Sequence, residues 1–227
     1  MMRTVQAAAL ATGLLLGSPL GHPIAHAAEV CSDFGGAVEQ DGLCRLQVTK
    51  PNYELSMSFP VDFPDQGAVD DFLTQTRTGF LNETGTPNFA GVPYAMDMKA
   101  SQWASDTTRS VSFEVYQDMG GAHPDTWYKT FNYDVVRSRP ITFADLFAPG
   151  VSPLNAIYPI VAQKLSAEMG MTAPISDSDG MDPSHYQSFA ITPVDVVFFF
   201  GRGELMAGAA GAHTVYVPRN AIPPLTV

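Results

Sequence analysis

The sequence predicts a single α+β domain, built mainly from an antiparallel sheet with two principal helices packed on one face. Stretches in which apolar and polar residues alternate, as in half-buried strands, outnumber helical patterns, and most connections between them are short. Two other stretches repeat apolar residues every three or four positions, as amphipathic helices do. A chain of 227 residues, 45% of them hydrophobic, is long enough to bury one core of this kind.

The N-terminus is typical of an export signal. Arg3 precedes an apolar run over residues 7–16, and Ala25-His26-Ala27 places small residues where a signal peptidase acts. Cleavage there gives a signal peptide of residues 1–27 and a domain of residues 28–227. No second apolar run in the sequence reaches the roughly 18–20 residues that span a bilayer. We therefore expect a secreted monomer without a transmembrane anchor, released or associated with the cell wall.

Cys31 and Cys44 are the only cysteines of the chain, and both follow the export signal. An even pair in an oxidising compartment favours a disulfide, which would tie an N-terminal arm to the domain. Closing so short a loop contributes about 2–3 kcal/mol. Two cysteines without histidines nearby do not make a structural zinc site.

The first half of the domain is predicted to contain three strands and one helix. Residues 53–59 alternate and form a strand that Pro60 ends. Residues 94–98 and 109–116 form a hairpin. Asp65 is placed to cap the helix between the first two strands, whose packing face is Val69, Phe72, Leu73, Thr76 and Phe80.

The second half begins with a strand over residues 127–136 and a short helical turn starting at Thr142 or Asp145. Ser152-Pro153 has the residues of a helix cap and first helical position, and Gly170 is a natural stop. The packing face of this second helix is Leu154, Ile157, Val161 and Leu165.

Pro159 conflicts with that helix, because an interior proline removes a hydrogen bond, so the helix either kinks there or starts near Tyr158. Farther on, residues 189–191 and 196–200 form a hairpin whose second arm is buried on both faces. Residues 214–217 form the last strand.

Charge and motifs exclude several classes of partner. The formal net charge of −11, which becomes −12 when Arg3 leaves with the signal, makes nucleic acid an unsuitable partner. An acidic surface suits a cationic partner or simply keeps the protein soluble. Phosphate-binding glycine loops and the usual histidine spacings of metal sites do not occur in the sequence. We therefore predict neither a metal site nor another cofactor.

A glycine pair, a histidine and a proline interrupt two strand patterns between residues 116 and 128. Gly120 and Gly121 permit positive φ, and Pro124 fixes its own φ, so the loop presents His123 and Asp125 between rigid strands. Such a loop is either a plain strand connection with a locally bonded His123 or a ligand-binding or catalytic segment.

Together with four other motifs, this loop resembles the mycobacterial secreted immunogenic-protein family. The motifs are residues 140–147, 186–192, 198–205 and 217–219, and the resemblance runs from about Cys31 to the C-terminus. The chain looks closest to a branch of secreted, cell-wall-associated esterases. It is more distantly similar to the extracellular lysozyme-binding domains of certain anti-sigma factors. The resemblance implies an α+β fold and an extracellular location, whereas activities differ among these relatives.

The esterase branch implies acyl transfer, although the Gly-x-Ser-x-Gly elbow of ordinary hydrolases does not occur in the sequence. A Ser-His-Asp mechanism needs a histidine as its base. The best candidate segment is residues 180–186, where Asp182 and Pro183 begin a short helix with Ser184 near its N-terminus. Ser184 is the candidate nucleophile, His185 or the distant His123 the base, and Asp182 the orienting carboxylate. The alternative is a plain helix cap with an exposed histidine.

Two further residues complete the candidates. Glu204 follows a turn after the apolar run 196–200, where it either lines a cleft or caps the next helical turn. His213 is expected to be a solvated residue at the entry of the last strand.

The second functional hypothesis is a non-catalytic extracellular module. It would bind a protein or another ligand, instead of a small ester substrate, through loops 120–125 and 177–185. The candidate binding residues are Gly120, Gly121, His123, Asp125 and Glu204.

Overall fold

The computed structural model describes residues 23–85 and 91–227. Most of the predicted export signal, residues 1–22, lies outside these ranges. The proposed cleavage point after Ala27 falls within the first helix, α1 (Pro23–Asp33).

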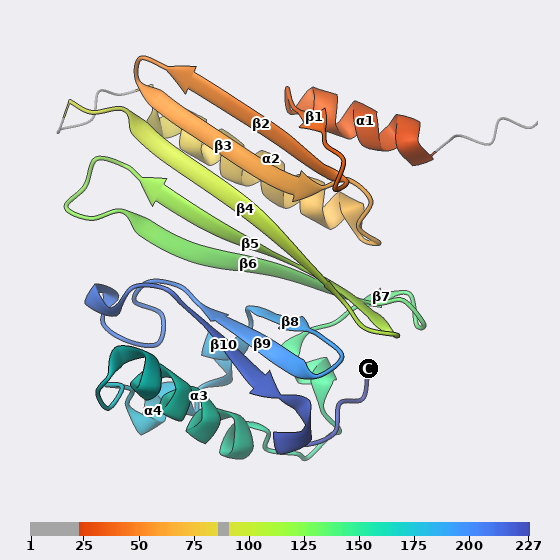
Figure 1. Ribbon diagram of the computed structural model, residues 1–227, viewed down its shortest axis with the longest axis vertical. Helices are drawn as coiled ribbons and strands as arrows, with labels where there is room; N and C mark the ends of the chain where they lie inside the picture. The colour runs from red at the N-terminus through yellow and green to blue at the C-terminus, as the bar shows by residue number, and fades with distance from the viewer. Residues whose placement is uncertain (1–22, 86–90) are drawn as a thin grey trace, which may run out of the picture.

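Strands and helices follow the chain in an order typical of an α+β protein (Figure 1). After α1 come β1 (Ala37–Val38), β2 (Leu43–Lys50), β3 (Tyr53–Pro60), α2 (Gln66–Glu83), β4 (Tyr94–Ala104), β5 (Thr108–Asp118), β6 (Asp125–Asp134) and β7 (Arg139–Pro140). The helices and strands of the rest are α3 (Leu154–Met169), α4 (Asp177–Gly180), β8 (Phe189–Ile191), β9 (Asp195–Phe200) and β10 (His213–Pro218). Four short 3-10 turns lie before, between or after them: Phe143–Leu146, Pro183–Tyr186, Gly208–Ala210 and Arg219–Ala221.

The larger sheet contains strands β1 to β7 in sequence order. Adjacent strands in this sheet are antiparallel except β3 and β4, which are parallel and are joined by α2. Alternation in β3 turns Leu55 and Met57 toward the core, where they pack in one cluster with Val69 and Leu73 of α2. In Figure 1, α2 lies behind β3, so the view is onto the opposite face of the sheet.

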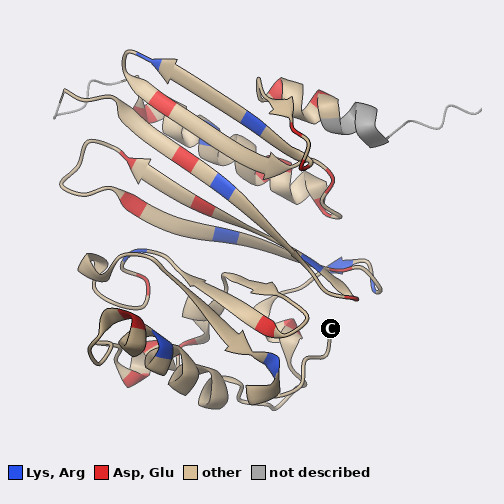
Figure 2. Cartoon of the chain, in the orientation of Figure 1, with Lys and Arg blue, Asp and Glu red and all other residues tan. Residues whose placement is uncertain are grey.

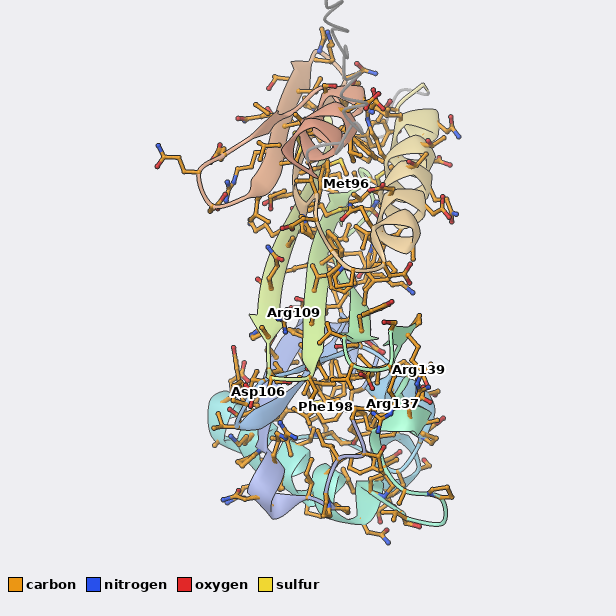
Figure 3. The ribbon with its side chains drawn as sticks, turned by 90° about the vertical axis from the view of Figure 1, so that its right-hand side faces the viewer. Met96, Asp106, Arg109, Arg137, Arg139 and Phe198 are labelled. Atoms are coloured by element: carbon orange, nitrogen blue, oxygen red, sulfur yellow. A yellow bond between two sulfur atoms is a disulfide. The ribbon has the colours of Figure 1, made fainter. Side chains whose placement is uncertain are left out.

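The smaller sheet has the order β10-β9-β8, and α3 covers one of its faces. Val196, Phe198 and Phe200 pack toward this helix, whereas Val197 and Phe199 pack toward Trp103 and Tyr128 of the larger sheet. Strand β9 is therefore buried on both faces, as its apolar sequence predicts. Figure 3 shows the two cores one above the other, with Met96 in the upper part and Phe198 in the lower.

The predicted α+β class and mainly antiparallel pairing are confirmed. The division of the strands into two sheets was not predicted, and each principal helix covers a different sheet. Strand β8 is short, and its outer edge meets side chains of the larger sheet in place of another strand.

Three buried or half-buried polar side chains make that junction between the sheets. Ser110 Oγ accepts the N–H of Ile191 at 3.1 Å, and Thr130 Oγ1 accepts the N–H of Phe189 at 3.2 Å. Asn132 Nδ2 donates to the carbonyl of Phe189 at 2.8 Å. The polar residues inside this interface thus satisfy backbone groups of a strand edge, which would be costly to bury unpaired.

Both principal helices begin close to the predicted residues. Asp65 precedes α2, but its side chain makes no capping hydrogen bond; Gln66 instead accepts the N–H of Phe63 at 2.8 Å. Helix α3 begins at Leu154 and continues through Pro159, so the alternative start near Tyr158 is wrong.

The predicted disulfide between Cys31 and Cys44 is present, and it joins α1 to β2. Gly36 lies against it, because a Cβ there would come within 2.7 Å of Cys44 Sγ and of the Arg45 carbonyl oxygen. The crosslink therefore fixes the N-terminal arm on the edge of the larger sheet.

Candidate functional site

The loop of residues 119–124 forms the exposed tip of the β5–β6 hairpin. Gly120 adopts φ of 69°, which favours glycine, and donates its N–H to Asp118 Oδ1 at 2.9 Å. His123 is exposed and makes no hydrogen bond with any residue that the structure describes, so the predicted local bond is absent. Gly121 and Asp125 are exposed beside it.

The turn at residues 182–186 has the predicted cap. Asp182 Oδ1 accepts the N–H of Ser184 at 2.8 Å, and Pro183 is the first residue of the 3-10 turn. Hydrogen bonds from the backbone and then the hydroxyl of Ser184 hold the pKa of Asp182 below its ordinary value. Buried Tyr186 anchors the turn by donating its hydroxyl to the carbonyl of Gly180 at 2.8 Å.

Glu204 is half-buried and closes the turn after β9. Its Oε2 accepts the N–H of Gly201 at 2.7 Å, and the next 3-10 turn has Ala207 as its cap. Burial raises the pKa of Glu204, while the bond from Gly201 and the positive charge of His185 act in the opposite direction. Glu204 and His185 are therefore close enough for their charges to interact, although they lie 19 positions apart in the sequence.

The segment that carries Glu204 is fastened to the larger sheet. Arg202 donates its N–H to the carbonyl of Thr126 at 2.7 Å. A Cβ on Gly201 would lie 3.3 Å from that carbonyl oxygen and from Trp127 Cα, so glycine permits the close approach. Glu204 is thus held beside the start of β6.

The fold brings together Asp182, Ser184, His185 and Glu204, which we call the His185 cluster. His185 interacts electrostatically with both carboxylates. His123 takes no part in these interactions. A half-buried imidazole within the electrostatic reach of two carboxylates has the groups that a general base and its orienting partner need.

His213 lies elsewhere, and its predicted solvent exposure is wrong. The side chain is 7% exposed on β10, where α3 covers the sheet, and its Nδ1 lies 3.2 Å from Glu168 Oε1. Its burial follows from the helix that packs over the strand, which the local sequence does not reveal.

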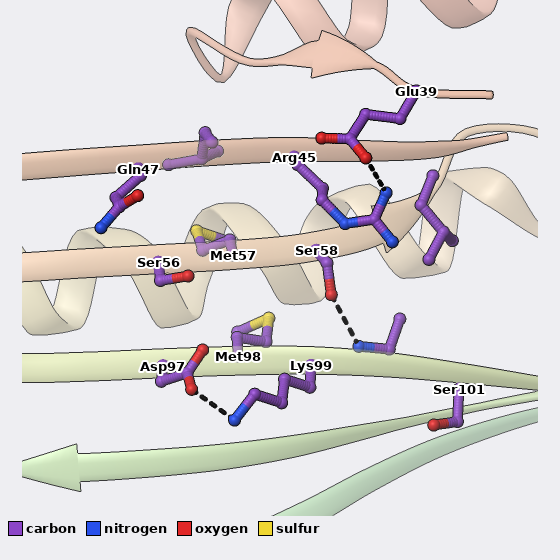
Figure 4. Close-up of a pocket in the computed structure, with 13 residues that line it drawn as sticks. Glu39, Arg45, Gln47, Ser56, Met57, Ser58, Asp97, Met98, Lys99 and Ser101 are labelled. Carbon is purple, nitrogen blue, oxygen red and sulfur yellow. Dashed lines mark hydrogen bonds and ion pairs between the residues drawn. The ribbon is translucent and has the colours of Figure 1, made fainter. Parts of the chain in front are cut away.

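A groove that the sequence did not predict lies on the open face of β2, β3 and β4 (Figure 4). Its volume is about 640 Å³. Lys99 Nζ lies 2.6 Å from Asp97 Oδ2, and Arg45 binds Glu39 at 2.7 Å. The lining is completed by Gln47, Ser56, Met57, Ser58, Met98, Ala100, Ser101, Leu43 and Leu46. Figure 2 shows both signs of charge along the strands of this sheet.

The described residues were compared with the requirements of a metal site and of a membrane-spanning helix. Within residues 23–85 and 91–227, no group of three or more His, Cys, Asp or Glu side chains could hold a metal ion. In the same part of the chain, no helix is long and apolar enough to cross a membrane.

Fold and sequence place this α+β protein among known relatives. A family model described as a protein of unknown function (DUF3298) matches residues 144–220. A solved structure of a DUF3298 family protein (PA4972) from Pseudomonas aeruginosa shares the fold, with a TM-score of 0.51 and 16% identity; the match covers 78% of this chain and 92% of that one.

Two mycobacterial sequences match nearly the whole domain. Esterase Rv3036c of Mycobacterium tuberculosis is 46% identical over 96% of this chain and 98% of its own length. Immunogenic protein MPB64 of Mycobacterium bovis is 36% identical over 85% of this chain and 86% of its own. The chain belongs to this mycobacterial immunogenic-protein family, which includes a member named as an esterase.

Proposed function

We propose that the protein is exported and hydrolyses short-chain carboxylic esters outside the cell, with the His185 cluster as its catalytic centre. The observation that carries the proposal is that the charges of Asp182 and Glu204 both act on His185, which follows the exposed Ser184 directly in the chain. The name of the 46% identical relative supports the same reaction class.

In the proposed reaction, Ser184 Oγ attacks the ester carbonyl carbon while His185 takes the hydroxyl proton. The bond from carbon to the alkoxy oxygen breaks, and the imidazolium returns the proton to the leaving alcohol. Water, activated by the same imidazole, then releases the carboxylic acid and restores Ser184. The carboxylate of Glu204 orients the imidazole and stabilises its protonated form, whereas Asp182 holds the turn.

This reaction requires one local movement. The hydroxyl of Ser184 bonds to Asp182 in the resting arrangement, so it has to rotate toward His185 before attack. Ser184 is exposed, and rotation about χ1 of an exposed serine is fast.

The assay is hydrolysis of nitrophenyl acetate and butyrate by disulfide-intact protein, at matched thermal stability. Ser184→Ala and His185→Gln should each reduce the rate about 10²–10⁴-fold, the usual contribution of general base catalysis. Glu204→Gln should reduce it less, and Ser152→Ala, which removes an exposed serine elsewhere, should not change it. An activated phosphonate should label Ser184 stoichiometrically.

Unchanged turnover in both Ser184→Ala and His185→Gln would refute the assignment. Loss of turnover in His123→Ala with both other variants active would transfer the role of base to the hairpin tip. Export is tested separately: the secreted form should begin at Ala28, and an intact N-terminus on the secreted protein would refute the cleavage site.

A non-catalytic recognition module is the second candidate. Ser184 lies on an exposed turn, and the groove on the open face of β2, β3 and β4 is lined by other residues. That exposure suits binding of a protein through loops 120–125 and 177–185 better than it suits enclosure of a small substrate. Absence of ester hydrolysis above the protein-free background would favour this candidate.

A further inference from the structure

The face of the larger sheet opposite α2 is only partly covered. The smaller sheet packs on one end of it, against Trp103 of β4 and Tyr128 of β6. The rest of the face, over β2 to β5, carries the groove of Figure 4. A second groove of about 360 Å³ shares Gln47, Ser56 and Asp97 with it and adds Tyr116. The two form one polar trough, which we call the sheet-face groove.

Strand register arranges the groove side chains in cross-strand rows. In one row, Arg45 pairs with Ser58, Ser58 with Lys99, and Lys99 with Glu114. The next row contains Gln47, Ser56, Asp97 and Tyr116. Side chains directly opposite each other on neighbouring strands lie within contact range. The rows therefore present a continuous strip of polar groups across four strands.

The cations in the groove are already neutralised. Lys99 pairs with Asp97, and Arg45 with Glu39 and Asp41. An anionic ligand would have to displace these carboxylates, and the surplus of acidic groups gives it no attraction.

Lys99 is also unsuited to activate a neighbouring serine. The hydrogen bond and charge of Asp97, with a further contribution from Glu114, hold the pKa of Lys99 above its ordinary value. The ammonium stays protonated at neutral pH, so it cannot take the proton of Ser58. The groove is therefore a binding surface without a nucleophile of the Ser-Lys type.

Neutral hydrogen-bonding groups remain available. The amide of Gln47 and the hydroxyls of Ser56 and Ser101 make no hydrogen bond with another residue in the described ranges. Ser58 Oγ accepts the N–H of Ala100 at 3.2 Å and keeps its own proton for donation. These groups both donate and accept, as the hydroxyls of a sugar do.

We propose that the sheet-face groove binds a neutral oligosaccharide laid across β2 to β5. The planar amide of Gln47 and carboxylate of Asp97 can each contact two neighbouring hydroxyls, and half-buried Tyr116 offers a ring face at one end. The volume of the main groove lies within the range of about 300–1,000 Å³ of ligand sites. The site is separate from the His185 cluster and does not depend on ester hydrolysis.

The test uses two neutral probes, maltohexaose and cellohexaose, titrated into isotopically labelled protein. Backbone amide shifts should be confined to the groove residues of β2 to β5, around Gln47, Ser56, Ser101 and Tyr116. The double variant Gln47→Ala, Ser56→Ala should weaken binding about tenfold, because each lost neutral hydrogen bond contributes about 0.5–1.5 kcal/mol. Gln102→Ala, an exposed glutamine of the same sheet outside the groove, should leave it unchanged.

Three results would overturn the proposal. One is the absence of shifts in the groove with either probe. Another is binding of either probe that survives the double variant. A ligand that binds only as an extended peptide, paired with the outer edge of β2 beyond β1, would likewise overturn it. The Gln47 and Ser56 variants should retain ester hydrolysis, so failure here is distinguishable from failure of the proposed activity.

Discussion

Removing the hydroxyl of Ser110 should weaken the junction between the two sheets. Its Oγ accepts the N–H of Ile191 at 3.1 Å, and both residues are 1% exposed. In Ser110→Ala the amide of Ile191 loses its acceptor in a place that water does not reach. Leaving such a group unsatisfied costs about 1–3 kcal/mol.

That range converts to a measurable change in thermal stability. A loss of about 2 kcal/mol in the free energy of unfolding corresponds to about 4–8 °C in Tm for a chain of this size. Urea unfolding followed by circular dichroism gives the free energy, and hydrogen exchange gives the local effect. The amide of Ile191 should exchange faster in Ser110→Ala because its local protection is lost. The amides of β3 should exchange faster only to the extent that the whole protein is less stable.

Ser112 provides a matched control on the same face of β5. It is 4% exposed, and its hydroxyl bonds to no other residue within the described ranges. Ser112→Ala removes a buried hydroxyl without leaving a partner unpaired, so its effect should be near zero or stabilising. Equal losses in the two variants, or unchanged exchange of the Ile191 amide in Ser110→Ala, would refute the reasoning.

Two further predictions concern stability. Replacing Cys31 and Cys44 together by alanine should lower the free energy of unfolding by about 3 kcal/mol, as calculated for a crosslink across this sequence separation of 13, and a reductant should not affect the variant further. The hydroxyl and N–H of Thr142 and the guanidinium of Arg139 lower the pKa of Asp145 from 3.8 to about 2. Because the folded pKa lies below the unfolded one, this stabilisation is full above about pH 4 and is lost as the pH falls toward 2. Asp145→Asn should therefore have a lower Tm at pH 7 and a flatter Tm profile below pH 4; an unchanged profile would contradict the assignment.

The sequence predicts elements whose pattern is set locally. β3, β4 and β5 alternate clearly because one face packs on α2 while part of the other stays polar. β2 alternates too, with Cys44, Leu46 and Val48 on one side, so its pattern also indicates a strand, although only an N-terminal arm is predicted before residue 53. The cap at Asp182 was predicted because a cap depends on neighbouring residues only.

Contacts between distant segments could not be predicted. The apolar run of β9 indicates burial on both faces, but its composition does not show that α3 lies on one side and another sheet on the other. The proximity of His185 and Glu204 depends on how the turn at residues 183–186 packs near the turn after β9. The burial of His213 depends on how α3 packs over β10. The sheet-face groove likewise depends on strand register, which a single strand pattern leaves open.

The parallel seam between β3 and β4 has a consequence for the order of folding. β4, β5 and β6 are joined by short hairpins, so they can pair rapidly through contacts that are close in sequence. β3 reaches β4 only across the connection that contains α2, and closing that longer loop costs more chain entropy. We expect the β4–β6 meander to form early and the seam to close late, when α2 docks.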